Sequence, residues 1–370
     1  MDAYLLRLFM FDLPRRVLNL SARVFLIFAT LACATSVSAA TTVKTSAIPV
    51  KVVVVSMFEH GEVSGDEAGE YQLWIERQKL DKKFAFPLGA YDLHMNEAGV
   101  LAICTGGGVT NATASIMALG TDPRFDLSKA YWVIAGIGGG DPLDVSLGTG
   151  VWAKHVVDGD LLYEIDGREI PNEWEYGLIP LGAKEPNQEA TGWTVDTIVY
   201  HLNPTLVDWA YQLTKNFPLT DTPAMKKFRA QYNGFPNALR PPFVTIGDTI
   251  GSSTYWHGEL LNNWANDWMH LHAGKDSNFM TTNMEDNGSL TALHRLAKAK
   301  LVDTNRVLVL RTVSNFSFPP PGKTAAWSTT APYPDKGLPA IEAAYGLGNH
   351  VVQELLSGWD KYEHTTPSVK

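Results

Sequence analysis

The segment VKVVVVSM, residues 50–57, is an almost uninterrupted run of β-branched residues. Runs of this kind are typical of strands that are covered on both faces, as in a parallel sheet. Three later segments repeat the theme, and each ends in small or polar residues: GVLAICTGGG (99–108), KAYWVIAGIGGG (129–140) and NRVLVLRTVS (305–314). Together the four segments predict the strands of a buried central sheet.

Helices are predicted between these strands. Residues 284–300 show the pattern most clearly, because leucines recur at helical spacing while polar residues occupy the other side. Alternating strands and helices predict an α/β fold, a single domain with a mostly parallel central sheet flanked by helices. The domain is expected to cover residues 50–362, with a polar insertion at 165–240. Further helices are predicted at residues 111–120, 256–274 and 337–359.

Residues 1–39 have the composition of an export signal. A basic stretch is followed by the apolar run VFLIFATLACA (24–34) and by small residues that suit cleavage after Ala39 or Ala40. The run has 11 residues, well short of the ~20 that a membrane-spanning helix needs. We therefore expect an exported protein, periplasmic or extracellular, with a lipoprotein anchor at Cys33 or an uncleaved anchor as alternatives.

The chain is acidic, with a formal net charge of −9. Removal of residues 1–39, which contain four arginines and two aspartates, changes this charge to −11. Since lysines and arginines form no cluster, the balance argues against nucleic acid or anionic lipid as a partner. No later apolar run is long enough for a spanning helix, which argues against an integral membrane pore. Cys104 would be the sole remaining cysteine, so no internal disulfide is expected.

Glycine-rich turns follow two of the predicted strands, where ligands bind in open α/β sheets. The turn in CTGGGVTNATASI contains Thr105, Gly106 and Asn111, and its backbone N–H groups could face an anion or a sugar hydroxyl. In AGIGGGDP, Gly138 and Gly139 could form a wall against which a flat ring lies. An ordinary tight turn explains either segment equally well.

A carboxylate and an amide follow two other predicted strands. Glu285, in TTNMEDNG, begins a helix directly after a strand, a place where the helix dipole alone favours an acid. A carboxylate at this position can also accept two hydrogen bonds from a vicinal diol such as that of ribose. In RTVSNFSFPPPG (311–322), the strand ends at Asn315 and a proline-stiffened loop follows.

Four motifs occur in one order along the chain: a TG-G--NA turn, a G--GG turn followed by the strand GTGVWAKHVVDGD (148–160), a Met-Glu strand–helix junction and a TVSN strand end. In this combination the chain resembles the nucleoside phosphorylase and nucleosidase superfamily. More closely, it resembles the purine nucleoside permease family over nearly all of the mature sequence. The resemblance implies a nucleoside phosphorylase-like fold, a purine nucleoside as ligand and no cofactor, with phosphate as a possible co-substrate.

The resemblance also implies roles for single residues. Glu285 would hold the ribose 2′- and 3′-hydroxyls, Met284 would lie under the sugar, and Tyr255 or Trp256 would stack on the base. Asn315 would meet purine N7, where many relatives have an aspartate and others an asparagine. An amide cannot deliver a proton, but its NH₂ can donate a hydrogen bond to N7 and its carbonyl can accept one from N1–H. We therefore expect a preference for inosine- or guanosine-like bases.

The loop EHGEVSGDEAGE (59–70) contains five acids and no lysine or arginine, so it would repel phosphate. This favours hydrolysis over phosphorolysis, with Glu59 or Glu62 as the candidate base. A solvated acidic loop without a catalytic role is the alternative. Arg77, Arg311 or a neighbouring subunit of a homo-oligomer could still hold phosphate.

The predicted function is cleavage of the N-glycosidic bond of a purine ribonucleoside to release the free base, as a nucleosidase or a phosphorylase. The alternative is a non-catalytic, exported purine nucleoside-binding protein that assists uptake. No metal site is expected. His270 and His272 are two residues apart on a predicted helix and therefore lie on different faces.

Overall fold

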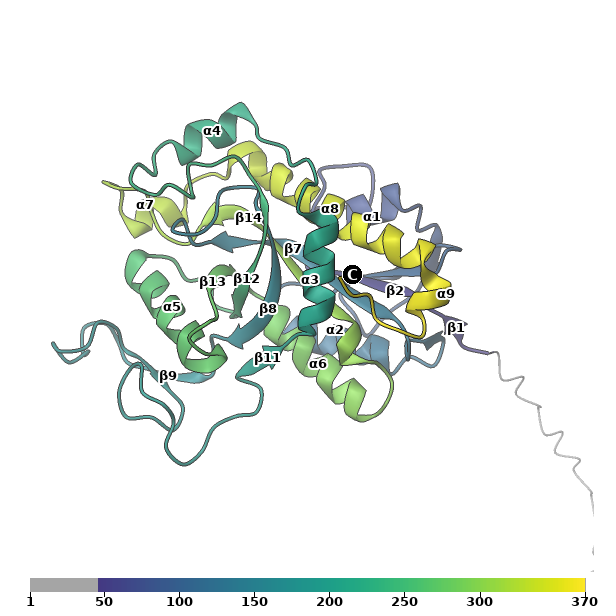
Figure 1. The fold of residues 1–370 in the computed structure, drawn as a ribbon, viewed down its shortest axis with the longest axis horizontal. Helices are drawn as coiled ribbons and strands as arrows, with labels where there is room; N and C mark the ends of the chain where they lie inside the picture. The colour runs from purple at the N-terminus through teal and green to yellow at the C-terminus, as the bar shows by residue number, and fades with distance from the viewer. Residues whose placement is uncertain (1–45, 370) are drawn as a thin grey trace, which may run out of the picture. The chain divides into compact units, whose positions relative to one another are not determined.

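A ring of five strands lies at the centre of the fold, which this computed structural model describes for residues 46–369 (Figure 1). Strand β14 (Val307–Phe316) closes the ring, because it pairs with β7 on one side and with β8 on the other. The other strands of this sheet lie in the order β11 (Val199–His201), β8 (Gly150–Asp158), β12 (Val244–Gly251), β13 (Phe279–Asn283), β7 (Tyr131–Gly140), β2 (Val52–Ser56), β5 (Val100–Cys104), β4 (Leu93–Met95) and β3 (Lys82–Phe84).

The sheet is mixed, which corrects the expectation of a mostly parallel sheet. Strands β2, β5, β7 and β14 run parallel to one another, and so do β8, β12 and β13. The two groups meet in antiparallel pairs where β13 joins β7 and where β14 joins β8. Closing the ring from two parallel groups produces these antiparallel seams. Antiparallel neighbours also extend the sheet at both margins, through β11 and through β4 and β3.

The helices agree closely with the predicted ranges. Helix α6 (Asp286–Lys298) packs against α2 (Val109–Gly120), and α8 (Leu338–Ser357) packs against β7 and β14. Helix α5 (Glu259–Ala273) also falls in its predicted range. Within residues 46–369 no helix combines the length and apolar character that crossing a bilayer requires. The shorter helices are α1 (Gln72–Arg77), α7 (Ala325–Thr329), α9 (Trp359–Tyr362), η1 (Thr304–Arg306) and η2 (Pro334–Gly337).

The segment 165–240, predicted as a polar insertion, has two parts. Its first part belongs to a hairpin, β9 (Leu162–Glu164) and β10 (Leu178–Pro180), that projects from the rest in Figure 1. Its second part contains β11, α3 (Pro204–Thr214) and α4 (Pro223–Arg229), of which β11 extends the main sheet and α3 packs on β8 and β12. Two short strands, β1 (Ile48–Pro49) and β6 (Phe125–Asp126), pair with each other. The predicted signal peptide and Cys33 lie outside the described residues.

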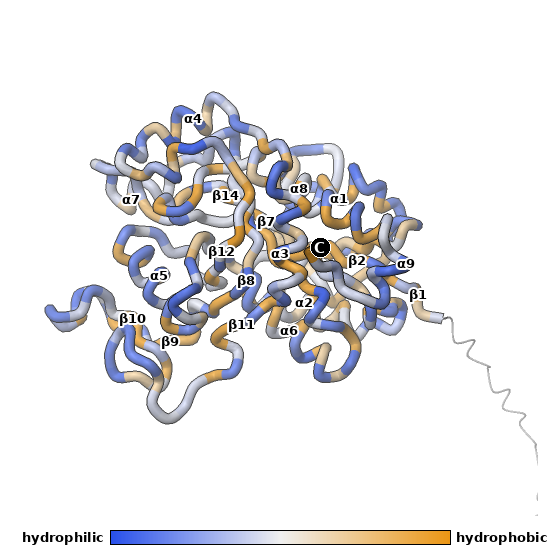
Figure 2. The backbone as a smooth tube through the Cα atoms, viewed as in Figure 1, coloured by the Kyte–Doolittle hydropathy of each residue, from blue (hydrophilic) through white to orange (hydrophobic). Residues whose placement is uncertain are grey.

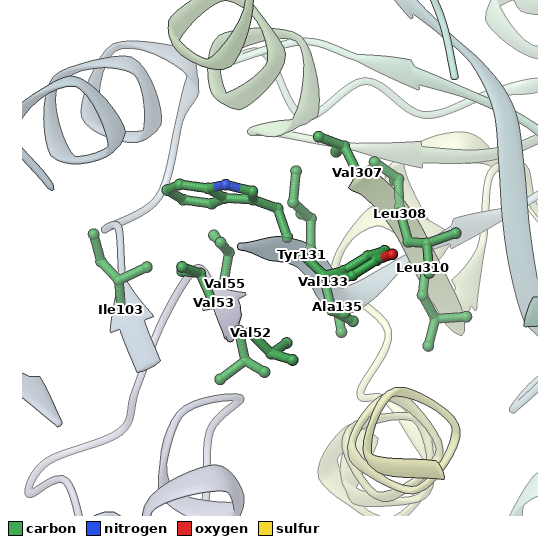
Figure 3. Packing of buried hydrophobic residues seen from close by; sticks show 14 of the residues in the cluster. Val52, Val53, Val55, Ile103, Tyr131, Val133, Ala135, Val307, Leu308 and Leu310 are labelled. Atoms are coloured by element: carbon green, nitrogen blue, oxygen red, sulfur yellow. The ribbon is translucent and has the colours of Figure 1, made fainter. Parts of the chain in front are cut away.

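The valine run of residues 52–55 forms a buried strand. All four valines of β2 are at most 1% exposed, and β2 lies between β5 and β7. Figure 3 shows Val52, Val53 and Val55 in one apolar cluster with side chains of β5, β7 and β14, and Figure 2 shows apolar residues along the central strands. Each buried valine stabilises the fold by about 1.5–3 kcal/mol. The packed strands form a rigid base from which the polar strand ends emerge.

Candidate functional site

A cavity of about 200 Å³ lies where β2, β7, β13 and β14 end. It brings together most of the site residues predicted from the sequence, and it adds several that the sequence did not indicate. The lining residues are Met57, Phe58, Glu70, Ile137, Gly138, Gly139, Thr254, Tyr255, Trp256, Thr282, Asn283, Met284, Glu285, Arg311, Ser314, Asn315 and Tyr333. The carboxylate of Glu285 and the amide of Asn315 therefore face one cavity, although they come from different strands.

An irregularity in β14 places Asn315 at this cavity. The register between β14 and β7 shifts between Val313 and Asn315, so Ser314 is an extra residue. A bulge of this kind can turn two consecutive side chains toward the same side, and both Ser314 and Asn315 line the cavity. The Ser314 hydroxyl lies 3.0 Å from Asn315 Oδ1, and Asn315 Nδ2 donates to the Tyr255 hydroxyl at 2.8 Å. The amide orientation is thus set by its neighbours.

Glu285 is the residue directly before α6, at its N-cap, where Asn283 shapes the chain. The side-chain oxygen of Asn283 accepts the backbone N–H groups of Glu285 (3.0 Å) and Asp286 (2.8 Å). Such side-chain capping satisfies N–H groups that a helix start leaves free. The Glu285 carboxylate, 6% exposed, accepts the backbone N–H groups of Gly108 and Met284, both at 3.2 Å. Burial raises the pKa of Glu285, and the Arg311 guanidinium opposes that rise.

The glycine-rich turn before α2 supports Glu285 and does not itself line the cavity. Its Gly108 N–H is given to Glu285, and the next N–H, of Val109, is given to the Ser253 hydroxyl at 3.1 Å. Two of the N–H groups predicted to face an anion are therefore already engaged. The other predicted residues of this turn shape its backbone or lie beside it: Thr105, Gly106 and Asn111.

Arg311 is buried beneath the cavity and all three of its guanidinium nitrogens are engaged. Nε donates to Asp286 at 2.9 Å, and Nη2 donates to Asp286 at 2.5 Å and to Glu285 at 3.3 Å. Nη1 donates to the backbone carbonyl of Ile137 at 2.9 Å. Arg311 is 2% exposed and Asp286 is fully buried. This arginine fixes Glu285 in place and has little left to offer a phosphate.

Glu70 lines the cavity and was not among the predicted bases. One of its carboxylate oxygens accepts the backbone N–H group of Met57, which directly follows β2, at 2.8 Å. The other accepts the backbone N–H group of Ile137, which lies within β7, at 2.7 Å. Gly136 makes room for it, because a Cβ there would meet the Glu70 carboxylate. Burial raises the pKa of Glu70 to about 8, against the opposing charge of Arg311.

The two predicted bases lie elsewhere. Glu59 is buried and accepts backbone N–H groups of the returning loop, from Gly69, Tyr71 (2.9 Å) and Gln72 (2.5 Å). Glu62 is exposed, and neither residue lines the cavity. Glu59 therefore folds the acidic loop so that Glu70 returns to the strand ends.

Both predicted glycines of β7 line the cavity, and both are also needed for packing. A Cβ on Gly138 would clash with the backbone carbonyl of Thr282, and a Cβ on Gly139 would press on the Thr282 methyl group. These contacts mark the seam where β13 crosses β7. The glycines allow the two strands to approach closely, whatever surface they present to a ligand.

The predicted aromatic residues lie on one side of the cavity. Tyr255 is 44% exposed, whereas Trp256 is buried and packs against Trp264 and Phe279. Tyr333 joins them from the segment after β14, with its hydroxyl 3.4 Å from that of Tyr255. Tyr333 lies outside every motif quoted from the sequence, so no sequence pattern indicated that it would line the cavity.

The second arginine considered for phosphate lies outside the cavity. Arg77 forms a bidentate ion pair with Glu342, with both distances at 2.6 Å. Among the described residues that line the cavity, Arg311 alone carries a positive charge. No group of three or more His, Cys, Asp or Glu residues in the described part of the chain could hold a metal ion.

Comparison with known families assigns the chain. The sequence model of the family described as "purine nucleoside permease" matches residues 49–367. The chain belongs to the purine nucleoside permease family. A family protein of Candida albicans is 33% identical over 267 residues, which are 71% of this chain and 65% of that protein. The chain thus spans just under two thirds of the length of this relative. A probable family member of Schizosaccharomyces pombe is 29% identical over 85% of this chain and 92% of its own.

The solved structures found by comparison share less sequence with this chain than the family relatives do. A 5′-methylthioadenosine/S-adenosylhomocysteine nucleosidase of Neisseria meningitidis has a TM-score of 0.49 and 14% identity, over 82% of this chain and 99% of its own. Futalosine hydrolase of Helicobacter pylori also has a TM-score of 0.49, with 13% identity over 83% of this chain and 98% of its own.

Proposed function

We propose that this protein binds a purine ribonucleoside in the cavity and cleaves its N-glycosidic bond with water. The observation that supports the proposal most is that Glu285 and Asn315 reach one cavity from separate strands, and that the buried carboxyl of Glu70 lines it as well. These three groups match the three demands of the reaction: a hold on the sugar, stabilisation of the departing base and a base for water.

The sugar is assigned to the end of the cavity that contains Glu285 and Met284. A carboxylate with two fixed oxygens can accept both hydroxyls of a vicinal diol. Arg311 and the Gly108 N–H hold these oxygens in position before any ligand binds. Such preorganisation reduces the free energy that ordering would cost on binding.

The purine is assigned to the end that contains Asn315 and Tyr255. As the bond from C1′ to N9 breaks, its electron pair moves onto the purine, and an N–H donor near N7 stabilises this charge. Both N–H hydrogens of Asn315 are engaged, one with the Tyr255 hydroxyl and one with the Phe316 carbonyl, so the amide supplies this donor by exchanging one of these partners for N7. No proton is transferred in that exchange. The departing purine anion then takes a proton from solvent and becomes the neutral free base.

Water is favoured over phosphate because of the charges at the cavity. Glu70 and Glu285 line it, Asp286 lies behind it, and the Arg311 guanidinium is already committed to these acids and to a backbone carbonyl. An anion would therefore enter a site with no free cation among the described lining residues. The same surplus of carboxyl groups suits the positive sugar of an oxocarbenium-like transition state.

Glu70 is assigned as the base that takes a proton from the attacking water. With a pKa of about 8, the carboxyl is mostly protonated at neutral pH and becomes the carboxylate as the pH rises. A base with a pKa near the working pH combines a sufficient ionised fraction with a strong pull on the proton. Glu70 thus takes the role expected of Glu59 or Glu62, neither of which lines the cavity.

Nucleoside binding without cleavage is the second candidate. It is favoured by Asn315, because an amide cannot protonate the leaving base, and by the word "permease" in the family description. In that case the same residues would hold an intact nucleoside during uptake.

One incubation separates the candidates. Purified protein is mixed with inosine in phosphate-free buffer and in buffer with added phosphate, and hypoxanthine, ribose and ribose 1-phosphate are quantified. We expect hypoxanthine and ribose at the same rate in both buffers. Ribose 1-phosphate formed only with phosphate would make the protein a phosphorylase. If the protein leaves inosine intact in both buffers and also retains it in bound form, the protein is a binding protein.

A further inference from the structure

Three polar groups meet at the purine end of the cavity: the amide of Asn315 and the hydroxyls of Tyr255 and Tyr333. Asn315 Nδ2 lies 2.8 Å from the Tyr255 hydroxyl, which in turn lies 3.4 Å from the Tyr333 hydroxyl. Apart from Tyr255, the described residues offer the Tyr333 hydroxyl no hydrogen-bond partner. The three groups form a short chain that ends at Tyr333.

The direction of hydrogen bonding along this chain is fixed at Asn315. Its Nδ2 carries two hydrogens, of which one goes to Tyr255 and the other to the carbonyl of Phe316 at 3.2 Å. The Tyr255 oxygen therefore acts as an acceptor, and the proton of its own hydroxyl must be donated onward. Two hydroxyl protons, of Tyr255 and Tyr333, then share at most one acceptor within the pair. At least one proton is left for a ligand.

Tyr333 is held in place by the segment that carries it. Ser328 accepts or donates a 2.7 Å hydrogen bond with His257, two residues from Tyr255. Asp335 bonds the Thr222 hydroxyl at 2.5 Å, and Lys336 pairs with Glu67 at 2.8 Å across the acidic loop. Burial raises the pKa of Tyr333, so its hydroxyl keeps its proton at neutral pH. The donor is therefore both positioned and protonated before a ligand arrives.

We propose that Tyr255 and Tyr333 form a hydroxyl pair that selects the substrate at purine carbon 6, by donating a hydrogen bond to an acceptor there. The inference rests on the proposed function, because it needs the purine to lie at this end of the cavity. A 6-oxo group accepts such a hydrogen bond. The 6-amino group of adenosine is itself a donor, and unsubstituted purine riboside has only a C–H at this position.

The test compares inosine with purine riboside, which lacks the 6-oxo group. Dissociation constants are measured by calorimetry in a Glu70→Gln background, so that the nucleosides stay intact. In that background Tyr333→Phe should weaken inosine binding about three- to tenfold, the effect of one hydrogen bond, and change purine riboside binding less than twofold. Tyr255→Phe should act in the same direction. Tyr163→Phe, an exposed tyrosine of the hairpin, is the matched control and should change neither.

An equal loss for both nucleosides, or no loss for inosine, would overturn the selection by the hydroxyl pair. If the Glu70→Gln protein with both tyrosines intact bound inosine normally in that case, the proposed nucleoside site would stand without the pair. Failure of this protein to bind either nucleoside would instead refute the proposed function. Circular dichroism of each variant separates loss of binding from loss of folding.

Discussion

Asn315 shows how one side chain limits the chemistry of the cavity. Its amide can donate to N7 but cannot transfer a proton, so a base that leaves well as an anion is favoured over one that must be protonated. Neighbouring groups already fix which amide atom faces Tyr255, since Ser314 occupies Oδ1. Asn315 therefore contributes to the choice between inosine and adenosine through N7, beside the contact at carbon 6 that we propose for the hydroxyl pair.

Replacement of Asn315 by aspartate should extend activity to adenosine. A carboxyl at this position can protonate N7, and general acid catalysis contributes about 10²–10⁴ in rate. We expect adenosine cleavage to rise at least about tenfold and to be greatest at acidic pH, where the new carboxyl is protonated. Adenine release followed from pH 5 to pH 9 checks this. Unchanged adenosine cleavage at every pH would contradict the placement of purine N7 beside residue 315.

Glu285→Gln should weaken the hold on the sugar. A hydrogen bond to a charged group is stronger than one to a neutral amide, so inosine affinity should fall about 10- to 100-fold. 2′,3′-Dideoxyinosine lacks both hydroxyls and should be bound equally by the variant and the parent. Titration of both proteins with both nucleosides, each protein in the Glu70→Gln background that leaves the nucleosides intact, measures the difference. A similar loss for the dideoxy compound would indicate damage to the cavity, and would contradict a diol at Glu285.

At the scale of elements, the seam between β7 and β13 sets the geometry of the site. Gly138→Ala should lower the stability of the protein by about 1–3 kcal/mol, because the new Cβ meets the carbonyl of Thr282 and forces the strands apart. Thermal unfolding followed by circular dichroism checks this, with Gly167→Ala as the control, since a Cβ there meets nothing within 4 Å. Equal melting temperatures for the two variants would mean that the seam is looser than described.

The sequence predicted the elements well and their closure poorly. The valine run of β2 and the apolar runs of β5, β7 and β14 were recognisable because strands buried on both faces contain few polar residues. The pairing of β14 with β8 was not, because residues about 160 apart along the chain meet there and no local pattern records it. The ring, and with it the mixed direction of the sheet, depends on that pairing.

The same distinction applies to the site. Glu285, Met284 and Asn315 directly follow or end strands, so their positions could be predicted from order along the chain. Glu70 is separated from β2 by a loop whose return is held by the hydrogen bonds of Glu59 to the backbone of residues 69–72. The acidic composition of the loop indicated a base, but composition cannot show which acid faces inward.

For the whole molecule, Glu70 links activity and stability to pH in opposite directions. Its pKa in the folded state, about 8, lies above its ordinary value of 4.5. The folded protein therefore binds a proton more tightly than the unfolded chain, and the free energy of unfolding falls as the pH rises from about 4.5 to 8. Relative to Glu70→Gln, the parent should lose a few kcal/mol over that range.

Denaturant unfolding of the parent and of Glu70→Gln at pH 5 and pH 8 measures this linkage. Over the same range, kcat/KM of the parent for inosine should rise with a midpoint near the pKa of about 8, while the variant loses about 100-fold or more in turnover at every pH. Parallel stability curves for the two proteins would show that Glu70 has an ordinary pKa in the fold.

A crystal structure of the Glu70→Gln variant with inosine tests the central claim most directly. The account predicts that the ribose 2′- and 3′-hydroxyls lie within hydrogen-bond distance of the Glu285 carboxylate and that N7 lies within reach of the Asn315 amide. A nucleoside bound in the opposite orientation, or outside the cavity, would contradict it.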